Sequence, residues 1–226
     1  MSRPDAPVMP PAPCGSAPRL WLGLLQGARA SSLSDQERTW GRQLPPVVRQ
    51  RYWQSRAALR LWLAGVLGCA PAAVPLHTPP GCPPQLLEEA GWVSLSHSGA
   101  ALLLGFSRAP LGVDLEPAAR PVAAVALMRR CFPPLEVAQL QRFDPEQQRV
   151  AVLTSWVLKE AAIKWRRRSL ARELTCWQLD HVSGRLRHRP EGLEPECGTG
   201  LAAGWRWAGV GAGMGQADLE VAMPGP

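Results

Sequence analysis

Two carboxylates separated by one residue stand in an alternating apolar segment, Leu111-Gly-Val-Asp-Leu-Glu116. In an extended strand successive side chains point to opposite faces, so Asp114 and Glu116 project to the same side, about 6 to 7 Å apart. Such a pair repels itself unless a cation lies between the two groups. Oxygen ligands of this kind suit Mg²⁺, which takes one or two protein carboxylates together with water and substrate phosphate. The solvated face of an amphipathic strand explains the same pattern, and the pattern alone leaves both interpretations open.

A second charged pair lies within Thr154-Ser-Trp-Val-Leu-Lys-Glu-Ala-Ala-Ile-Lys-Trp165. Helical spacing places Glu160 and Lys164 on the apolar stripe of this segment, where a charge is costly unless it is paired or bound to metal. An ordinary Glu-to-Lys salt bridge one turn apart is the simpler alternative. It does not explain why Lys159 and Lys164 are the only lysines among 25 basic residues. Because nearly all basic residues of this chain are arginine, a position that keeps lysine is a candidate site where a compact ammonium group is required in place of a planar guanidinium.

A histidine flanked by two serines, Ser96-His97-Ser98, precedes Gly99. A hydroxyl and an imidazole at the end of a strand could both contact a phosphate, although a lone histidine is more often structural. The histidine has no neighbouring acid to suggest a catalytic triad, and the chain contains no GxSxG elbow. P-loop and dinucleotide-binding glycine patterns are also absent from the sequence.

Helices are predicted from periodicity and capping residues. Ser34, with Glu37 three residues later, matches the capping box of a helix start. Apolar residues recur at helical spacing over residues 47–67, and Gly68 favours a helix end there. Asp144-Pro145 pairs an N-cap with Pro at the first helical position, which opens a helix through about Arg172. The basic residues of the helix over 47–67 are Arg49, Arg51, Arg56 and Arg60.

Alternating segments predict the strands. Residues 92–98, 101–106 and 111–116 follow one another closely and are expected to form a three-stranded meander. Further strands are expected at 20–25, 202–208 and 218–223, with a hairpin formed by 176–182 and 185–189.

This order of elements puts a long helix and antiparallel strands in each half of the chain, which predicts an α+β fold. We expect a flexible proline-rich tail over residues 1–18, an N-terminal half over 19–111 and a C-terminal half over 112–226. No apolar run approaches the roughly 20 residues that span a bilayer, and the N-terminus does not match a signal peptide. The cysteines show no paired spacing, which favours reduced thiols in a cytoplasm and no zinc site.

The formal net charge of +7 and the pI near 9.7 indicate an anionic partner. Nucleic acid, a phosphorylated small molecule and an acidic protein all satisfy that condition. The ten tryptophans are scattered along the chain, which does not favour a base-stacking platform. A non-enzymatic, basic nucleic-acid-binding protein nevertheless stays the alternative to an enzyme.

Three motifs occur in a recognisable order: SLSHSG at 94–99, GVDLE at 112–116 and WVLKEAAIK at 156–164. With those gaps they resemble the 4'-phosphopantetheinyl transferases of the surfactin-synthetase-activating type. The resemblance implies transfer of the phosphopantetheine arm of coenzyme A to a serine of an apo acyl- or peptidyl-carrier protein, with release of adenosine 3',5'-bisphosphate. It also implies two similar halves related by a pseudo-twofold axis, each with antiparallel strands packed on a long helix, and coenzyme A between them.

By match to the family motifs, Asp114, Glu116 and Glu160 would hold Mg²⁺ together with the coenzyme A pyrophosphate. Glu160 is the candidate base for the carrier serine, and Glu136, in Cys131-Phe-Pro-Pro-Leu-Glu136, is its rival. Lys164 would contact the pyrophosphate and stabilise charge on the leaving group.

The same resemblance assigns coenzyme A contacts to Arg51, Ser96 and His97, with Lys159 addressing a phosphate or the rim of the site. Replacement by arginine is expected to be milder at Lys159 than at Lys164. Gly81-Cys82-Pro83 stands where family members often have Gly-Lys-Pro, so one coenzyme A contact differs.

The partner implied by the resemblance is an acidic carrier protein. Two basic groups are candidates for its docking surface: Arg129 with Arg130, and residues 166–168. A solvated basic face explains the same residues, and the sequence leaves both interpretations open. No nucleic-acid or membrane partner is expected, and two fused halves favour a monomer.

Overall fold

The computed structural model of the chain describes residues 17–25, 30–87 and 89–223. The predicted tail over 1–18 therefore lies almost wholly outside the described residues. The N-terminal half contains β1 (Arg19–Leu24), α1 (Asp35–Arg42), α2 (Pro46–Leu67), β2 (Leu76–His77), β3 (Gln85–Leu86), β4 (Trp92–Ser98) and β5 (Ala101–Ser107). Short 3-10 turns lie at Ala30–Ser32 and Pro71–Ala73.

The C-terminal half begins with β6 (Leu111–Pro117) and continues through four helices, α3 (Ala124–Cys131), α4 (Pro134–Leu140), α5 (Pro145–Trp165) and α6 (Leu170–Glu173). It ends with β7 (Trp177–Leu179), β8 (Leu186–His188), β9 (Cys197–Ala202), β10 (Trp205–Gly211), a 3-10 turn at Met214–Gln216 and β11 (Asp218–Ala222). The mixture of helices and mostly antiparallel sheets confirms the α+β class.

Local signals predicted most helix ends correctly. The Ser34 hydroxyl accepts from the Glu37 N–H while the Glu37 carboxylate accepts from the Ser34 N–H, so the capping box is present. Gly68 ends α2 in the left-handed conformation, with φ of 68°. Asp144 caps α5 through the N–H groups of Glu146 and Gln147.

The predicted end of α5 at Arg172 is wrong, because the helix ends at Trp165. Arg167 takes the left-handed conformation, with φ of 51°, and the Arg168 N–H bonds back to the Ile163 carbonyl. Glycine is the usual residue at such a helix end, so an arginine there left no signal in the sequence. The Arg167 guanidinium lies over the Trp92 ring of β4, 4.6 Å from its centre.

The sheets differ from the predicted meander. One sheet has the order β11-β1-β5-β4 and a second has the order β6-β10-β9. The hairpin of β4 and β5 is correct, but β6 leaves that sheet and pairs antiparallel with β10. The strand predicted at 202–208 is two strands, β9 and β10, joined by a tight turn. β11 pairs parallel with β1, so the last strand of the chain belongs to the first sheet.

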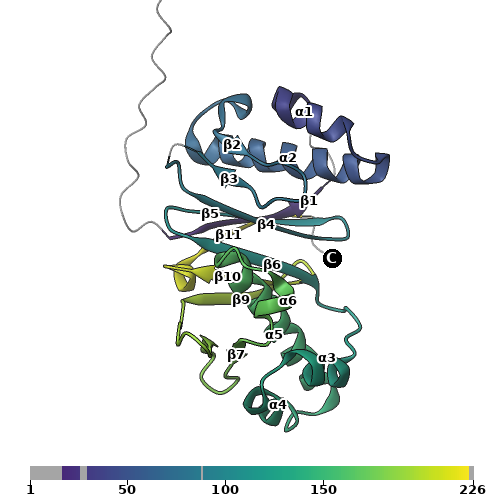
Figure 1. Cartoon of the computed structure of the whole chain (residues 1–226), viewed down its shortest axis with the longest axis vertical. Coiled ribbons are helices and arrows are strands. Elements are labelled where there is room, and N and C mark those ends of the chain that lie inside the picture. Colours follow the sequence, from purple (N-terminus) through teal and green to yellow (C-terminus); the bar gives the residue numbers. More distant parts are fainter. Residues whose placement is uncertain (1–16, 26–29, 88, 224–226) are drawn as a thin grey trace, which may run out of the picture.

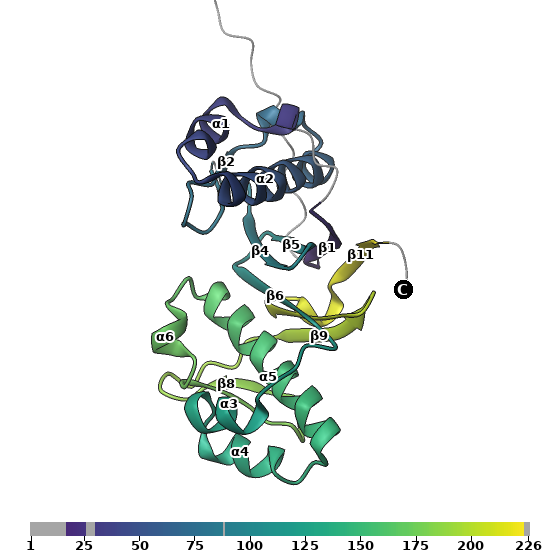
Figure 2. The ribbon, with the colours of Figure 1, turned by 90° about the vertical axis from the view of Figure 1, so that its right-hand side faces the viewer.

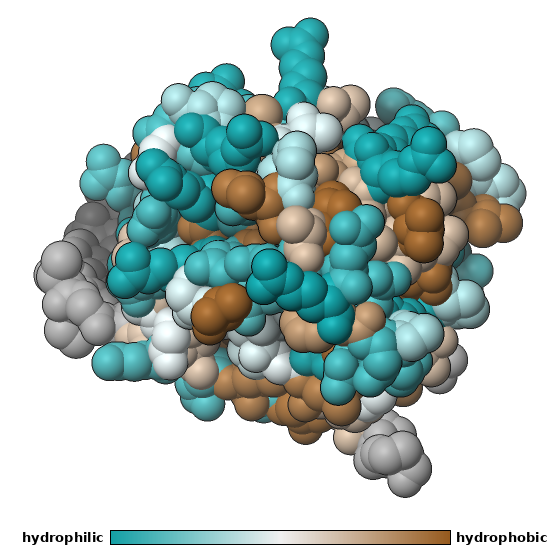
Figure 3. All heavy atoms as spheres, turned by 90° about the horizontal axis from the view of Figure 1, so that it is seen from below, coloured by the Kyte–Doolittle hydropathy of each residue, from teal (hydrophilic) through white to brown (hydrophobic). Residues whose placement is uncertain are grey.

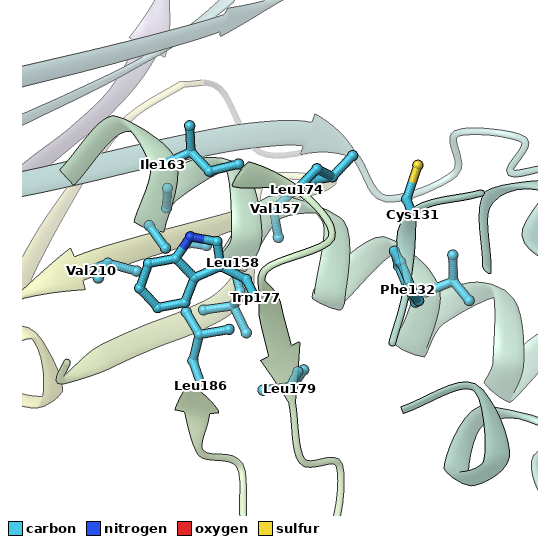
Figure 4. Close-up of a cluster of buried hydrophobic side chains, with 14 of the residues drawn as sticks. Cys131, Phe132, Val157, Leu158, Ile163, Leu174, Trp177, Leu179, Leu186 and Val210 are labelled. Carbon is cyan, nitrogen blue, oxygen red and sulfur yellow. The ribbon is translucent and has the colours of Figure 1, made fainter. Parts of the chain in front are cut away.

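Figure 1 shows the elements stacked in layers. Three clusters of buried hydrophobic side chains hold these layers together. One lies between α2 and the first sheet, where Leu59 and Leu63 meet Leu102 and Leu104. A second lies between the two sheets and is lined by inward side chains of β1, β5 and β6. The third lies beneath α5 and includes Trp177, whose side chain is fully buried (Figure 4). Each half thus packs one long helix against strands, as the view in Figure 2 also shows.

None of the described helices is both long and apolar enough to cross a membrane. The five cysteines within the described residues are all free thiols.

Candidate active site

The site forms where the edge strand of one sheet, β4, lies beside the edge strand of the other, β6. No backbone ladder joins these strands, and serine side chains bridge them instead. The Ser96 hydroxyl donates to Asp114 Oδ1 at 2.7 Å, and the Ser98 hydroxyl donates to Glu116 Oε2 at 3.1 Å. Ser94 Oγ accepts from the Val113 N–H at 3.1 Å.

Strand alternation orients both elements as the sequence predicts. Leu111, Val113 and Leu115 face the cluster between the sheets. Asp114 and Glu116 therefore point the other way, toward α5, with only 4% and 15% of their side chains exposed. A solvated strand face is thus excluded as the explanation of this carboxylate pair.

Lys164 reaches this carboxylate pair from α5. Its ammonium donates to Asp114 Oδ1 at 2.7 Å, to the Ser96 hydroxyl at 3.0 Å and to the Val113 carbonyl at 3.1 Å. The helix and both strands therefore converge on one ammonium group. The sequence offered a salt bridge between Lys164 and Glu160, four residues apart on one helix, as the simpler alternative. In the structure Lys164 pairs instead with Asp114, on a different element.

Glu160 lies on α5 one turn before Lys164 and faces the same two strand carboxylates. Burial and, next, the negative charge of Asp114 raise the pKa of Glu160 to about 7, while the positive charge of Lys164 opposes the shift. A carboxyl group with a pKa near neutral pH can both accept and release a proton in that range.

Glu116 is more exposed than Asp114, with 15% of its side chain accessible against 4%. It is paired with the Arg120 guanidinium, four residues further along the chain. Each strand carboxylate therefore has one serine donor from β4 and one cation, Lys164 for Asp114 and Arg120 for Glu116.

His97 points to the opposite face of β4 from Ser96, because neighbouring strand residues alternate. Val93 and Leu95, on the same face as His97, pack in the cluster with α2. Burial and the nearby charge of Arg51 lower the pKa of His97, which favours a neutral imidazole. Arg51 and His97 thus share one environment, on the α2 side of β4.

Among the described residues, no group of three or more His, Cys, Asp or Glu side chains is arranged as a ready metal cluster. Lys164 and Arg120 lie against two of the three carboxylates that would be the ligands. The donor set nevertheless suits a hard divalent cation, since three carboxylates lie close enough to perturb one another. Asp114 Oδ2 is buried and has no hydrogen-bond partner in the described structure, an arrangement that calls for a ligand.

The structure does not bring Lys159 and Glu136 to this site. Lys159 Nζ lies 2.7 Å from Glu136 Oε2 in the core of the C-terminal half, and both side chains are fully buried. The ammonium also lies over the Phe132 ring, 3.6 Å from its centre. Burial raises the pKa of Glu136 and lowers that of Lys159, and each charge opposes the shift of the other.

Two of the four basic residues that the sequence places in α2 are buried. Arg60 is buried and donates to Glu37 Oε2 at 2.6 Å and to three carbonyls of the segment 71–76. Arg56 is also buried, while Arg51 is exposed. Of these arginines, only Arg51 combines exposure with proximity to His97.

Part of the predicted docking surface is engaged within the chain. Arg166 pairs with Glu173 and Glu191, and Arg167 stacks on Trp92. Arg129 and Arg130 are exposed at the end of α3. Arg130 also lines a hollow of about 380 Å³ between α3 and α5, whose other lining residues include Arg120, Val122, Leu127 and Trp156.

Sequence reasoning missed the roles of Ser94 and Ser98. The signal was present, because serines at 94, 96 and 98 repeat with the strand period of two. It could not be interpreted without knowing that β4 lies beside β6, because serine at alternate strand positions is equally common on a solvated face.

A close approach of α5 to β6 depends on Gly112. A Cβ atom at this position would lie 2.0 Å from the Ala161 carbonyl oxygen and 2.3 Å from the Trp165 backbone nitrogen. Glycine therefore allows the helix to reach the strand that carries Asp114.

We expect Gly112→Ala to lower the free energy of unfolding by about 1–3 kcal/mol, because backbone must move to admit the methyl group. It should also displace Glu160 and Lys164 from Asp114. Urea unfolding measures the first effect, and the matched control is Gly65→Ala in α2, where a Cβ meets no atom within 4 Å. An equal loss of stability in both variants would contradict the packing argument.

Comparison with known proteins adds an independent observation. Residues 110–203 match the family model of the 4'-phosphopantetheinyl transferase superfamily. A protein of Synechocystis sp., itself only provisionally named a 4'-phosphopantetheinyl transferase, is 31% identical over 156 residues, or 65% of this chain and 63% of that protein. The 4'-phosphopantetheinyl transferase of Bacillus subtilis is 31% identical over 107 residues, or 45% and 46% of the two chains.

The matches therefore span about half to two thirds of these curated relatives. The family resemblance inferred from the three motifs is confirmed at the level of the superfamily.

Proposed function

We propose that this chain, which carries the 4'-phosphopantetheinyl transferase superfamily region at residues 110–203, transfers the 4'-phosphopantetheine arm of coenzyme A to a serine of an apo carrier protein. The observation that carries the proposal is the convergence of Asp114, Glu160 and Lys164 where β4, β6 and α5 meet. Adenosine 3',5'-bisphosphate would leave. We further propose that the two helix-on-sheet halves, 19–111 and 112–226, are related by a pseudo-twofold axis.

Coenzyme A would be recognised through its phosphates. Arg51 and His97 offer a cation and an imidazole on the α2 side of β4, which suits the 3'-phosphate. Ser96 and Lys164 lie on the other side of the same strand, beside Asp114, and suit the pyrophosphate. Alternation along β4 thus lets two neighbouring residues contact two separate phosphate groups.

Asp114, Glu116 and Glu160 would hold Mg²⁺, and the buried, unpartnered Oδ2 of Asp114 supports this assignment. The bound metal would neutralise phosphate charge as the transfer proceeds. The ammonium of Lys164 is a mobile point charge on a flexible stem and is suited to stabilising charge on the leaving phosphate.

Glu160 is the better candidate base. The new bond joins the carrier serine oxygen to the β-phosphorus, the phosphoanhydride bond breaks, and the serine proton must be accepted. Glu160 lies at the site beside Asp114 and Lys164, so its carboxylate could accept that proton. Glu136, the rival, is fully buried and paired with Lys159, which argues against direct contact with a carrier.

An acidic carrier would dock on the face that carries Arg129 and Arg130. The hollow beside Arg130 is lined mainly by apolar side chains, so it can accept an apolar group between flanking charges. Viewed from below, the surface shows separate hydrophobic patches within a hydrophilic surround (Figure 3).

We also propose that the protein is located in the cytoplasm and acts as a monomer.

A mass assay tests the function directly. Purified protein, coenzyme A, Mg²⁺ and a panel of apo acyl- and peptidyl-carrier proteins are incubated, and each carrier is weighed by mass spectrometry. We expect at least one carrier to gain the mass of the phosphopantetheine arm, and chelation of Mg²⁺ to abolish the gain. If every carrier stays unmodified, the proposal is wrong.

Two control incubations separate the other activities that these residues could support. Coenzyme A without carrier should stay intact, whereas a Mg²⁺-dependent phosphoesterase would hydrolyse it. Binding of an oligonucleotide that persists after replacement of Asp114 and Glu160 would instead favour the nucleic-acid-binding alternative.

A further inference from the structure

The contacts between β4 and β6 follow a regular register. Ser96 meets Asp114 and Ser98 meets Glu116, so the two pairs share one offset of 18 positions. The partners advance together along both strands, which means that β4 and β6 run parallel. Serines and carboxylates with the same period of two therefore meet pair by pair.

These serine contacts differ from the one at Ser94. Ser94 Oγ accepts a hydrogen bond from a backbone N–H of β6 and so attaches the strand itself. Ser96 and Ser98 instead donate to carboxylate oxygens. Their hydroxyls thus fix the orientation of a functional group, whereas Ser94 fixes only the backbone.

Each donor serine binds one oxygen of its carboxylate, Ser96 on Asp114 and Ser98 on Glu116. On Asp114, the Ser96 hydroxyl and the Lys164 ammonium both bind Oδ1, and Oδ2 remains without a hydrogen-bond partner. On Glu116, Ser98 binds Oε2 while Arg120 pairs with Oε1. A hydrogen bond to one oxygen sets the rotation of the carboxylate and therefore the direction of the other oxygen. On Asp114 that other oxygen is free, whereas on Glu116 a cation would have to replace the half-exposed Arg120.

We propose that Ser98 is a positioning residue that orients Glu116 for a divalent cation, as Ser96 orients Asp114. The inference rests on the proposed function for the identity of the cation site. It assigns Ser98 no contact with coenzyme A or with the carrier. Groups that hydrogen-bond to metal ligands set their geometry and, when removed, typically weaken metal affinity about 10- to 100-fold.

Mn²⁺ binding to the full-length protein tests this inference without turnover. Free Mn²⁺ is measured by electron paramagnetic resonance in titrations with and without coenzyme A, and no carrier is present. Ser98→Ala should raise the Kd for Mn²⁺ about 10-fold. Ser98→Thr, which keeps a hydroxyl, should restore affinity to within about twofold of the wild type.

Ser94→Ala is the matched control, because it removes a hydroxyl from the same face of the same strand. It leaves the Val113 N–H without its acceptor, so the melting temperature should fall while the Kd for Mn²⁺ stays near the wild-type value. With Mg²⁺ in the transfer assay, Ser98→Ala should raise the Mg²⁺ concentration needed for half-maximal rate and leave the saturated rate largely intact.

Three results would overturn the inference: an unchanged Mn²⁺ affinity in Ser98→Ala, an equal loss in Ser94→Ala, or no Mn²⁺ binding by the wild type in either titration. A wild type that binds Mn²⁺ but modifies no carrier would contradict the proposed function alone.

Discussion

Asp114→Ala and Glu160→Ala are each expected to slow carrier modification by at least about 100-fold, since loss of an outer partner of a metal ligand alone costs about 10- to 100-fold. Asp114 contributes a buried oxygen without a hydrogen-bond partner and also holds the Lys164 ammonium in place. Glu160 would supply both a metal contact and the base. Each replacement therefore removes two functions from the site at once.

The initial rate of mass gain on a carrier, measured at saturating coenzyme A, checks this prediction. Glu146→Ala is the matched control, because Glu146 is an exposed glutamate of the same helix, paired with Arg149. It should keep the wild-type rate. Circular dichroism must show that Asp114→Ala and Glu160→Ala remain folded, and a near wild-type rate in either folded variant would refute the metal assignment.

Lys159→Met is expected to lower the free energy of unfolding by about 3–5 kcal/mol, because it leaves Glu136 as an uncompensated buried acid. The cost should be large because both side chains are fully buried and their charged atoms lie 2.7 Å apart. The Glu136 carboxylate also accepts from the Leu179 N–H at 3.2 Å, which joins α4 to β7.

The double variant Glu136→Gln with Lys159→Met gives the decisive comparison. Glutamine keeps an acceptor for the Leu179 N–H but carries no charge, so the double variant should recover much of the stability lost in Lys159→Met. Urea unfolding of the wild type, of the single variants Glu136→Gln and Lys159→Met, and of the double variant completes a double-mutant cycle. Additive losses would show that the two residues are not energetically coupled.

The structure changes the expected order of the effects of Lys159→Arg and Lys164→Arg. The sequence predicts that replacement by arginine is milder at Lys159 than at Lys164, because a pyrophosphate in a metal-filled cleft would leave little room for a guanidinium at Lys164. In the structure Lys159 is enclosed beside Phe132, and a guanidinium needs more room than an ammonium. For stability we therefore now expect Lys159→Arg to be the more damaging change, while Lys164→Arg should act mainly on turnover.

Local periodicity determined most of the elements that form the site. Alternation in residues 111–116 placed Asp114 and Glu116 on one face, and helical spacing placed Glu160 one turn from Lys164. Both statements concern residues within one element, where backbone geometry fixes the direction of each side chain. The sequence therefore determined which side chains could act together within a strand or a helix.

Only the tertiary structure decided what each face meets. The pairing of β6 with β10, and of β11 with β1, joins strands far apart in the chain, and several alternating strands could have filled those places. Lys159 and Glu160 are neighbours in sequence, yet one helical step turns their side chains about 100° apart. That rotation places Lys159 against Glu136 in the core and Glu160 beside the strand carboxylates. The sequence could not predict this difference, because burial depends on packing partners from distant parts of the chain.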